Sequence, residues 1–260
     1  MNKLLSILAA VLLTACASIA DAGSLVDVTV INRSTGERLP VYRHRGRLYV
    51  EGQAGQRYAV ELRNRGGGRI LTVLSVDGVN AITGETAAAA QSGYVLDAWS
   101  RAEIAGWRKD LSDVAAFYFT ALPDSYAART GRPDNVGVIG VAVYTEYVEP
   151  PPPIPEAAPA ASASVAAAPQ AAARAADAAG SAQSSPRREK LAERKLGTGH
   201  GERIHAPTRS TEFRRAGSAP AELITVYYDS RTNLIAQGVI PRAPRLPHPF
   251  PNGGFVPDPA

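Results

Sequence analysis

The chain has very few of the residues from which disulfides, thiolate metal sites and catalytic centres are built. It has one cysteine, Cys16, so no disulfide can form within a molecule and the fold depends on its apolar core. It has four histidines, no Gly-x-Ser-x-Gly sequence, and no Ser-x-x-Lys with supporting motifs. The sequence leaves enzymatic activity undecided, and these absences favour a protein that is not an enzyme.

Long apolar runs are also missing, apart from a short one at the N-terminus. Lys3 precedes the apolar residues 4–13, which are too few to span a bilayer, so residues 1–22 are typical of a bacterial signal peptide. Residues 13–16 (Leu-Thr-Ala-Cys) resemble a lipobox, in which the cysteine thiol receives a diacylglycerol. We expect Cys16 to be lipidated, with outer-membrane sorting. The alternative is cleavage after residues 20–22 (Ala-Asp-Ala), which would give a soluble periplasmic or secreted protein.

Between residues 26 and 147 the apolar residues recur with a period of two. Val26, Val28 and Val30 alternate with polar residues, as in a strand with one buried face. Residues 70–76 are more continuously apolar and indicate an inner strand. Glycine-containing turns separate such segments, which is typical of antiparallel sheets. We therefore predict an all-β fold over residues 24–148, an antiparallel β-sandwich of the immunoglobulin-like or jelly-roll-like kind.

The composition changes sharply at residue 149. Residues 149–186 are rich in proline, alanine and serine and lack periodic large apolar residues, so they predict a disordered linker. Residues 187–221 are predicted to form a basic loop or a short helix. Strand patterning returns in residues 222–240, which predict a β-hairpin that docks on the sandwich, because an isolated hairpin is marginally stable. The proline-rich tail, residues 241–260, is expected to be irregular.

Three residues are weak candidates for a metal site. His200, Glu202 and His205 are close in the sequence, and imidazole and carboxylate groups bind zinc. Their spacing matches no zinc motif, and a polar loop made mobile by glycine is the favoured interpretation. No cofactor is expected. These residues, with nearby carboxylates, define the alternative function, a periplasmic hydrolase or metal-dependent enzyme.

Two tryptophans are weak candidates for ligand binding. Exposed Trp99 or Trp107 side chains would stack on sugar rings, although large aromatic side chains more often pack in a core or at a sheet edge.

Basic residues are gathered in blocks. Residues 33–69 carry a net charge of +6, residues 70–149 carry −5, and residues 186–215 carry +5. The basic blocks suit anionic envelope polymers or lipid headgroups, and pairing with the acidic block inside the fold is the alternative. Nucleic acid is not an expected partner of an exported chain. The further weak ligand-binding candidates from this pattern are Arg63, Arg65 and Arg69.

The chain resembles a set of uncharacterised exported proteins of proteobacteria. The resemblance covers the strand-rich stretch 26–147, with residues 122–126 (Leu-Pro-Asp-Ser-Tyr) and 135–143, and the C-terminal residues 196–203 and 227–230. It implies export and brings no activity or site residue with it. We expect a non-catalytic binding or assembly module of the cell envelope. Its partners would be the membrane, through the lipid, and an anionic polymer or another envelope protein.

Overall fold

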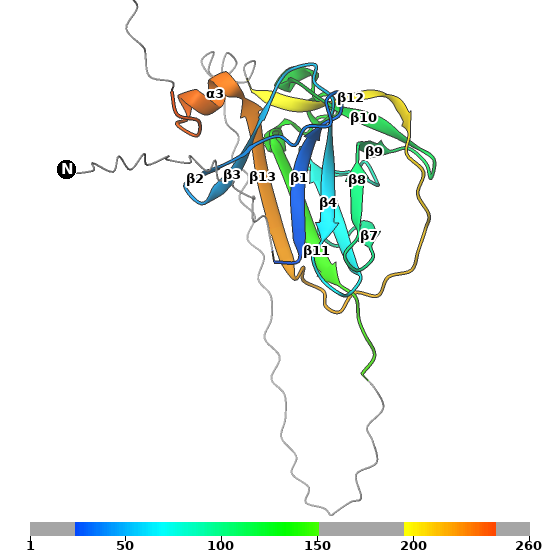
Figure 1. Cartoon of the computed structure of the whole chain (residues 1–260). Coiled ribbons are helices and arrows are strands. Elements are labelled where there is room, and N and C mark those ends of the chain that lie inside the picture. The colour runs from blue at the N-terminus through cyan, green and yellow to red at the C-terminus, as the bar shows by residue number, and fades with distance from the viewer. Residues whose placement is uncertain (1–23, 151–194, 243–260) are drawn as a thin grey trace, which may run out of the picture.

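The computed structural model describes residues 24–150 and 195–242 (Figure 1). The predicted signal peptide with Cys16, most of the predicted linker, residues 187–194 and nearly all of the proline-rich tail lie outside this part of the chain. The described residues form an all-β fold of several antiparallel sheets, as the sequence predicts. None of the helices within it has the length and apolar character needed to cross a bilayer.

One layer of the sandwich is a three-stranded antiparallel sheet. Val26, Val28 and Val30 are buried, whereas Asp27 and Thr29 between them are partly exposed, so the predicted alternation is confirmed. The strands follow one another across this sheet as β1 (Val26–Asn32), β4 (Tyr58–Asn64) and β8 (Arg101–Ile104).

The opposing layer is a seven-stranded sheet to which both described parts of the chain contribute. The order is β2 (Val41–His44), β3 (Arg47–Gly52), β13 (Glu222–Ser230), β11 (Val138–Thr145), β5 (Ile70–Val76) and β6 (Val79–Asn80), and β7 (Tyr94–Leu96) also pairs with β5. β13 runs antiparallel to β11 and parallel to β3. The C-terminal strand therefore lies inside the sheet, and the sandwich does not end at residue 148.

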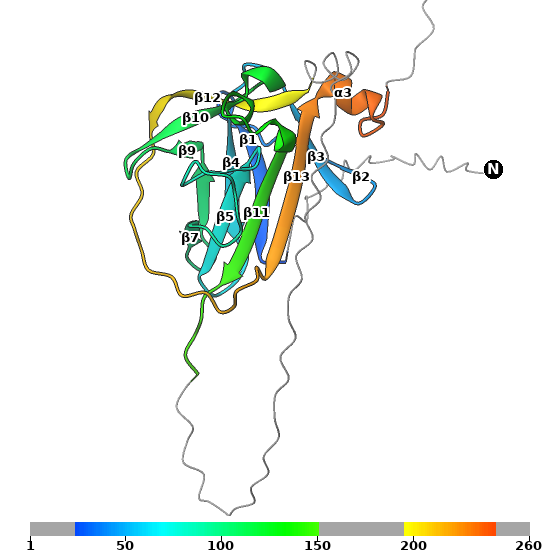
Figure 2. The same ribbon diagram turned by 180° about the vertical axis from the view of Figure 1, so that it is seen from behind.

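A third sheet, also of three strands, crosses one end of the sandwich, uppermost in Figures 1 and 2. It consists of β12 (Leu196–His205), β10 (Asp113–Ala121) and β9 (Gly106–Arg108). Short helical turns join β10 to β11 and follow β13: η1 (Leu122–Asp124), α1 (Tyr126–Arg129), η2 (Pro133–Asn135) and α3 (Arg231–Ala236).

Aromatic side chains fill the core where the third sheet meets the other two. The ring of Tyr58 stacks on Phe119 at a centroid distance of 4.2 Å and on Phe117 at 5.4 Å. Trp107 meets Phe117 edge-on at 4.7 Å. All four side chains are buried. Large aromatic residues from three strands thus provide the apolar burial that a fold without disulfides requires.

The predicted C-terminal hairpin over residues 222–240 is correct in its first strand and wrong in its second. β13 docks on the sandwich, but the residues after it form the helix α3. The hydroxyl of Ser230 accepts a hydrogen bond from the backbone N–H of Asn233 at 3.3 Å and caps the helix. Gly238, with φ +74°, follows its end, and Leu234 on the helix is fully buried.

The predicted basic loop or short helix over residues 187–221 is also wrong in part, because it contains the strand β12. This strand pairs with β10 along nearly its whole length. Its glycines, which suggested a mobile loop, allow close packing instead. A Cβ at Gly199 would overlap the ring of Tyr118, and one at Gly197 would lie 2.6 Å from neighbouring side-chain atoms.

A buried polar network joins the turn after β5 to strands β4, β12 and β13. The carboxylate of Asp77 accepts hydrogen bonds from the backbone N–H of Gly137 at 2.9 Å, from that of Thr198 at 2.7 Å, and from the Tyr228 hydroxyl. The Thr198 hydroxyl is hydrogen-bonded to Tyr228 at 2.7 Å and to Tyr58 at 2.6 Å. Burial raises the pKa values of Asp77, Tyr58 and Tyr228, so this network stays protonated on both phenols.

Candidate ligand-binding groove

The outer face of the seven-stranded sheet carries a second, smaller apolar cluster. It consists of Leu71 and Val73 on β5 and Ala142 and Tyr144 on β11, and Phe213 packs against it. These strands are apolar on both faces, which explains why residues 70–76 have the pattern of an inner strand. The cover on this face is the segment 206–216, called here the strap, which connects β12 to β13.

The strap is fixed at its first end by the loop before β10. The backbone N–H of Ala206 donates to the carbonyl of Ser112 at 2.8 Å, and that of Thr208 donates to the carbonyl of Leu111 at 2.8 Å. The guanidinium of Arg108, at the end of β9, donates to the carbonyl of Ala206. This end of the strap is therefore held by backbone pairing and by one charged side chain.

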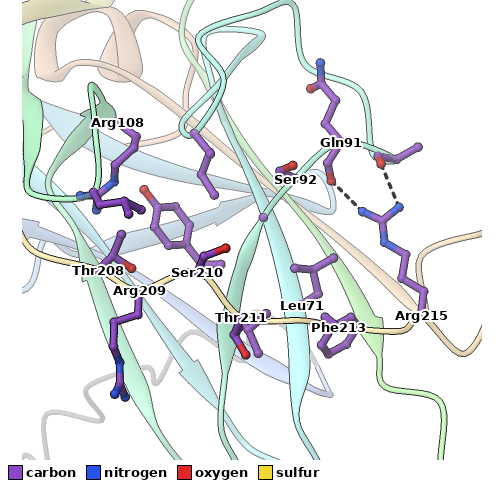
Figure 3. Close-up of a pocket in the computed structure, with 16 residues that line it drawn as sticks. Leu71, Gln91, Ser92, Arg108, Thr208, Arg209, Ser210, Thr211, Phe213 and Arg215 are labelled. Carbon is purple, nitrogen blue, oxygen red and sulfur yellow. Dashed lines mark hydrogen bonds between the residues drawn. The ribbon is translucent and has the colours of Figure 1, made fainter.

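The other end of the strap is fixed on β11 and on the loop before β7. Backbone bonds join Tyr147 N–H to the Arg214 carbonyl at 2.7 Å and Ala216 N–H to the carbonyl of the last residue of β11 at 2.9 Å. The guanidinium of Arg215 lies 4.2 Å from the ring centroid of Tyr144 and donates to the carbonyls of Ala90, at 2.9 Å, and Gln91, at 2.6 Å (Figure 3).

A groove of about 710 Å³ lies between the strap and the sheet, within the size range of small-molecule sites. Its far wall is the loop that leads into β7, where Gly93 packs so closely that a Cβ would lie 2.5 Å from the carbonyl oxygen of Thr72. The lining residues are Leu71, Ile82, Ala90, Gln91, Ser92, Gly93, Tyr94, Val95, Arg108, Leu111, Thr208, Arg209, Ser210, Thr211, Phe213 and Arg215.

Two polar side chains in the wall of the groove interact with each other. The hydroxyl of Tyr94 and Nε of Arg108 are both buried, and the Arg108 side chain is hydrogen-bonded to that hydroxyl. Burial raises the pKa of the Tyr94 hydroxyl, and the positive charge of Arg108 opposes that shift. The hydroxyl therefore has its partner in the wall itself, and Arg108 contributes its positive charge to the groove.

The charges that line the groove have one sign. Arg108, Arg209 and Arg215 line it, and no Asp, Glu or His is among its described lining residues. The Arg215 guanidinium is occupied by backbone carbonyls, and Arg209 extends away from the other labelled side chains in Figure 3. Arg108 also donates to the carbonyls of Ala206 and Asp110, so what it offers a ligand is its positive charge beside the apolar wall. The hydroxyls of the lining have no base beside them among the lining residues, and the arrangement is suited to binding an anion or an acceptor group.

The weak metal candidates do not come together. Glu202 forms an ion pair with Arg57 at 2.9 Å, and His205 lies 3.4 Å from Asp113. The described residues contain no group of three His, Cys, Asp or Glu side chains that could hold a metal ion. His200 faces the aromatic core instead.

The imidazole of His200 packs among aromatic rings, 6.2 Å from the ring centroid of Trp107 and 5.1 Å from that of Tyr126. Burial and the nearby charge of Lys109 lower the pKa of His200. This histidine is therefore a neutral side chain packed at the core boundary, and the sequence-based metal hypothesis finds no support in its surroundings.

The two tryptophans have opposite positions. Trp107 is 1% exposed and belongs to the main core, so its candidacy as a sugar-stacking residue is wrong. Trp99 is 68% exposed, at the far end of the sandwich from the third sheet. The candidates Arg63, Arg65 and Arg69 lie on β4 and in the loop after it, so they share this end with Trp99.

Sequence reasoning missed Tyr94, Arg108 and the strap. Nothing in their spacing connects residues 94, 108 and 206–216. The only available signal is the apolar character of both faces of residues 70–76, which requires a second covering segment without identifying it.

Comparison with known proteins adds no further assignment. No protein-family model matches the sequence, and no characterised protein or solved structure is detectably similar to it. The chemistry of the groove and of the exposed end therefore carries the functional argument.

Proposed function

We propose that this protein is a non-catalytic binding module of the cell envelope, and that the groove beneath the strap holds a small ligand with an anionic or acceptor group and an apolar body. The observation that carries the proposal is the lining of the groove, in which the cation Arg108 lies beside an apolar wall and no carboxylate is among the described lining residues. A carboxylate or phosphate group in the groove would meet the positive charge of Arg108.

The apolar body of the ligand would lie on the sheet side of the groove. Leu71, Val95 and Phe213 line this side and belong to, or pack against, the small outer cluster. Burial of apolar surface contributes about 25 cal/mol per Å², so this wall would supply affinity while Arg108 and Tyr94 fix the orientation. The absence of His, Asp and Glu from the described lining supports a binding role over hydrolysis.

The envelope location in this proposal rests on residues 13–16, the Leu-Thr-Ala-Cys sequence. A diacylglycerol on Cys16 would anchor the module in the outer membrane, facing the periplasm. Ligands of the proposed class, with an anionic head and an apolar body, are components of that environment.

Native mass spectrometry of the protein isolated from its own envelope tests the proposal. The wild-type chain should carry additional mass from an anionic amphiphile, and Arg108→Gln should lose it. Arg203→Gln, which changes an exposed arginine on β12, is the matched control and should retain it. An unliganded wild-type chain that takes up no anionic amphiphile on addition would contradict the proposal.

A further inference from the structure

An exposed tryptophan lies at the end of the sandwich opposite the third sheet. Trp99 is 68% exposed, and its backbone has φ +60°, a left-handed conformation that a bulky residue adopts at a cost. Trp107, the other tryptophan of the chain, is buried. A tryptophan that is mostly exposed buries little apolar surface in the isolated fold and adds the cost of its backbone conformation. These two facts favour a role in binding over a role in stability.

The loops that carry Trp99 are held in place by Asn64. We call them the tip, residues 65–68 and 97–100. The buried amide of Asn64 donates to the carbonyls of Gly68 and Asp97, both at 2.8 Å, and accepts from the backbone N–H of Gly66 at 2.8 Å. The N–H of Trp99 donates to the Gly66 carbonyl at 3.2 Å. The indole is therefore presented from a supported surface, which reduces the ordering cost of binding.

Two like charges lie directly opposite each other beside the tip. Arg63 on β4 is the cross-strand partner of Arg101 on β8. Both are exposed, and neither has an ion pair with a carboxylate of the described residues. Like charges in this position destabilise a sheet, and an anionic partner would relieve the repulsion.

On its other side Arg63 has Asp27 of β1 as its cross-strand partner, and the carboxylates of this end form ion pairs with other arginines. Asp27 lies 3.6 Å from Arg65, and Asp97 lies 3.5 Å from Arg69. Arg63 and Arg101 are therefore the arginines of this end that have no ion pair with a described carboxylate.

Exposed aliphatic side chains occur at the same end of the molecule. Leu223 near the start of β13 is 68% exposed, and Val148 after β11 is 81% exposed. The register of β13 with β11, and of β11 with the start of β5, places both at the end where the tip lies, lowermost in Figure 2. Isolated aliphatic side chains gain nothing from stacking on sugars, but they gain from contact with lipid.

The described chain also begins at this end. The backbone N–H groups of Ser24 and Leu25 donate to the carboxylate of Glu222 at 2.6 and 2.9 Å, and the N–H of Arg65 in the tip donates to the carbonyl of Leu25 at 2.9 Å. Seven residues lie between Cys16 and Ser24, and the eight steps along the chain span at most about 28 Å. A lipid on Cys16 would hold this end of the sandwich near the membrane.

We infer that this end of the sandwich is a membrane-docking surface, in which Trp99 enters the headgroup region of an anionic bilayer while Arg63 and Arg101 meet lipid phosphates. Tryptophan has the amphipathic ring that suits this interface, and basic side chains near anionic lipid contribute about 1 kcal/mol each. The proposed lipid on Cys16 serves here only to place this end of the sandwich toward the membrane. The test uses a chain without that lipid, so the docking surface and the lipidation of Cys16 are tested independently.

The experiment uses the chain beginning at Gly23, which contains every described residue and no acylation site. It is mixed with vesicles of phosphatidylglycerol and phosphatidylethanolamine, and with phosphatidylcholine vesicles for comparison. Because Trp107 is buried, changes in tryptophan emission report on Trp99. We expect a blue shift and quenching by brominated acyl chains with the anionic vesicles only, and weaker binding as salt is raised.

Variants separate the tip from general charge attraction. Measured by co-sedimentation with the vesicles, Trp99→Asn should weaken binding at least tenfold, and Arg63→Gln with Arg101→Gln should do the same. Arg129→Gln with Arg203→Gln, on α1 and β12, removes the same charge elsewhere and should leave binding within twofold. Circular dichroism confirms that each variant is folded. Absence of vesicle binding, equal loss in the control variant, or a Trp99 shift with anionic glycan fragments and not with vesicles would each overturn the inference.

Discussion

The hydroxyl of Tyr228 donates a hydrogen bond to the carboxylate of Asp77, although 151 residues of chain separate the two. The bond joins β13, which follows the segment that the structure does not describe, to the turn after β5. Asp77 also accepts from two backbone N–H groups and is fully buried. The segments on both sides of residues 151–194 therefore belong to one cooperative unit.

Replacing Asp77 with Asn should destabilise the protein by about 1–3 kcal/mol, because the new amide N–H₂ group would face the N–H of Gly137 or Thr198 without an acceptor. Asn tolerates the positive φ of this position, so the backbone is not the cause. Urea unfolding measures the change. The exposed Asp124→Asn is the control, and its free energy of unfolding should change by less than about 0.5 kcal/mol. An equal effect in both variants would show that the network is not important.

The same carboxyl should make stability depend on pH in a direction opposite to that of an ordinary ion-paired aspartate. Burial raises the pKa of Asp77 in the folded state above its unfolded value. Between these two values the folded state binds more protons, so the contribution of Asp77 to stability is greatest below about pH 4 and declines as the pH rises through the folded pKa. The measurement is the difference in unfolding free energy between wild type and Asp77→Asn at several pH values. A difference that grows as the pH rises would contradict this assignment.

Trp99→Asn should leave stability unchanged or raise it by up to about 1 kcal/mol, because asparagine accepts a left-handed backbone more readily and the indole buries little surface. Trp107→Ala, by contrast, should lose about 3–5 kcal/mol from the core. Thermal unfolding of both variants checks this contrast. A large loss for Trp99→Asn would mean that the indole serves the fold and would remove the reason to assign it a binding role.

The strap should open locally when Arg215 is replaced. Arg215→Gln loses two charge-assisted hydrogen bonds to the carbonyls of Ala90 and Gln91 and the contact with the Tyr144 ring. A local loss of about 1.5 kcal/mol corresponds to roughly tenfold faster trypsin cleavage after Arg209. In the control variant Arg203→Gln, on β12, trypsin should cleave after Arg209 at the wild-type rate. Unchanged cleavage at Arg209 in Arg215→Gln would show that this arginine does not hold the strap.

The strands can be predicted from the sequence where the local pattern of apolar residues follows from which faces are buried. The valines of β1 alternate because one face is buried, and the continuous apolar run of β5 reflects two covered faces. The helix α3 was missed because residues 234–240 were judged by their β-branched and apolar content. The capping residue Ser230 and the terminating Gly238 were the overriding local signals.

The candidate sites were less predictable because they depend on contacts distant in the sequence. Trp99 and the arginines 63, 65 and 69 are separate weak candidates in the sequence, which does not show that they share one end of the sandwich or distinguish Trp99 from the buried Trp107. The groove forms because the strap crosses the outer face of the seven-stranded sheet. The apolar periodicity of the sequence does not predict where the strap lies. The glycines of β12 permit close contact with Tyr118, and this is visible only once β10 lies beside them.

The most direct test of the proposed binding function is calorimetric titration of the chain beginning at Gly23 with decanoate, decyl phosphate and uncharged decanol. We expect saturable one-to-one binding of at least one of the two anions, weaker binding of decanol, and at least a tenfold loss of anion affinity in Arg108→Gln and in Tyr94→Phe. Arg203→Gln should bind as the wild type does. Absence of binding by both anions, or affinities that Arg108→Gln and Tyr94→Phe leave unchanged, would contradict the assignment of the groove as the ligand site.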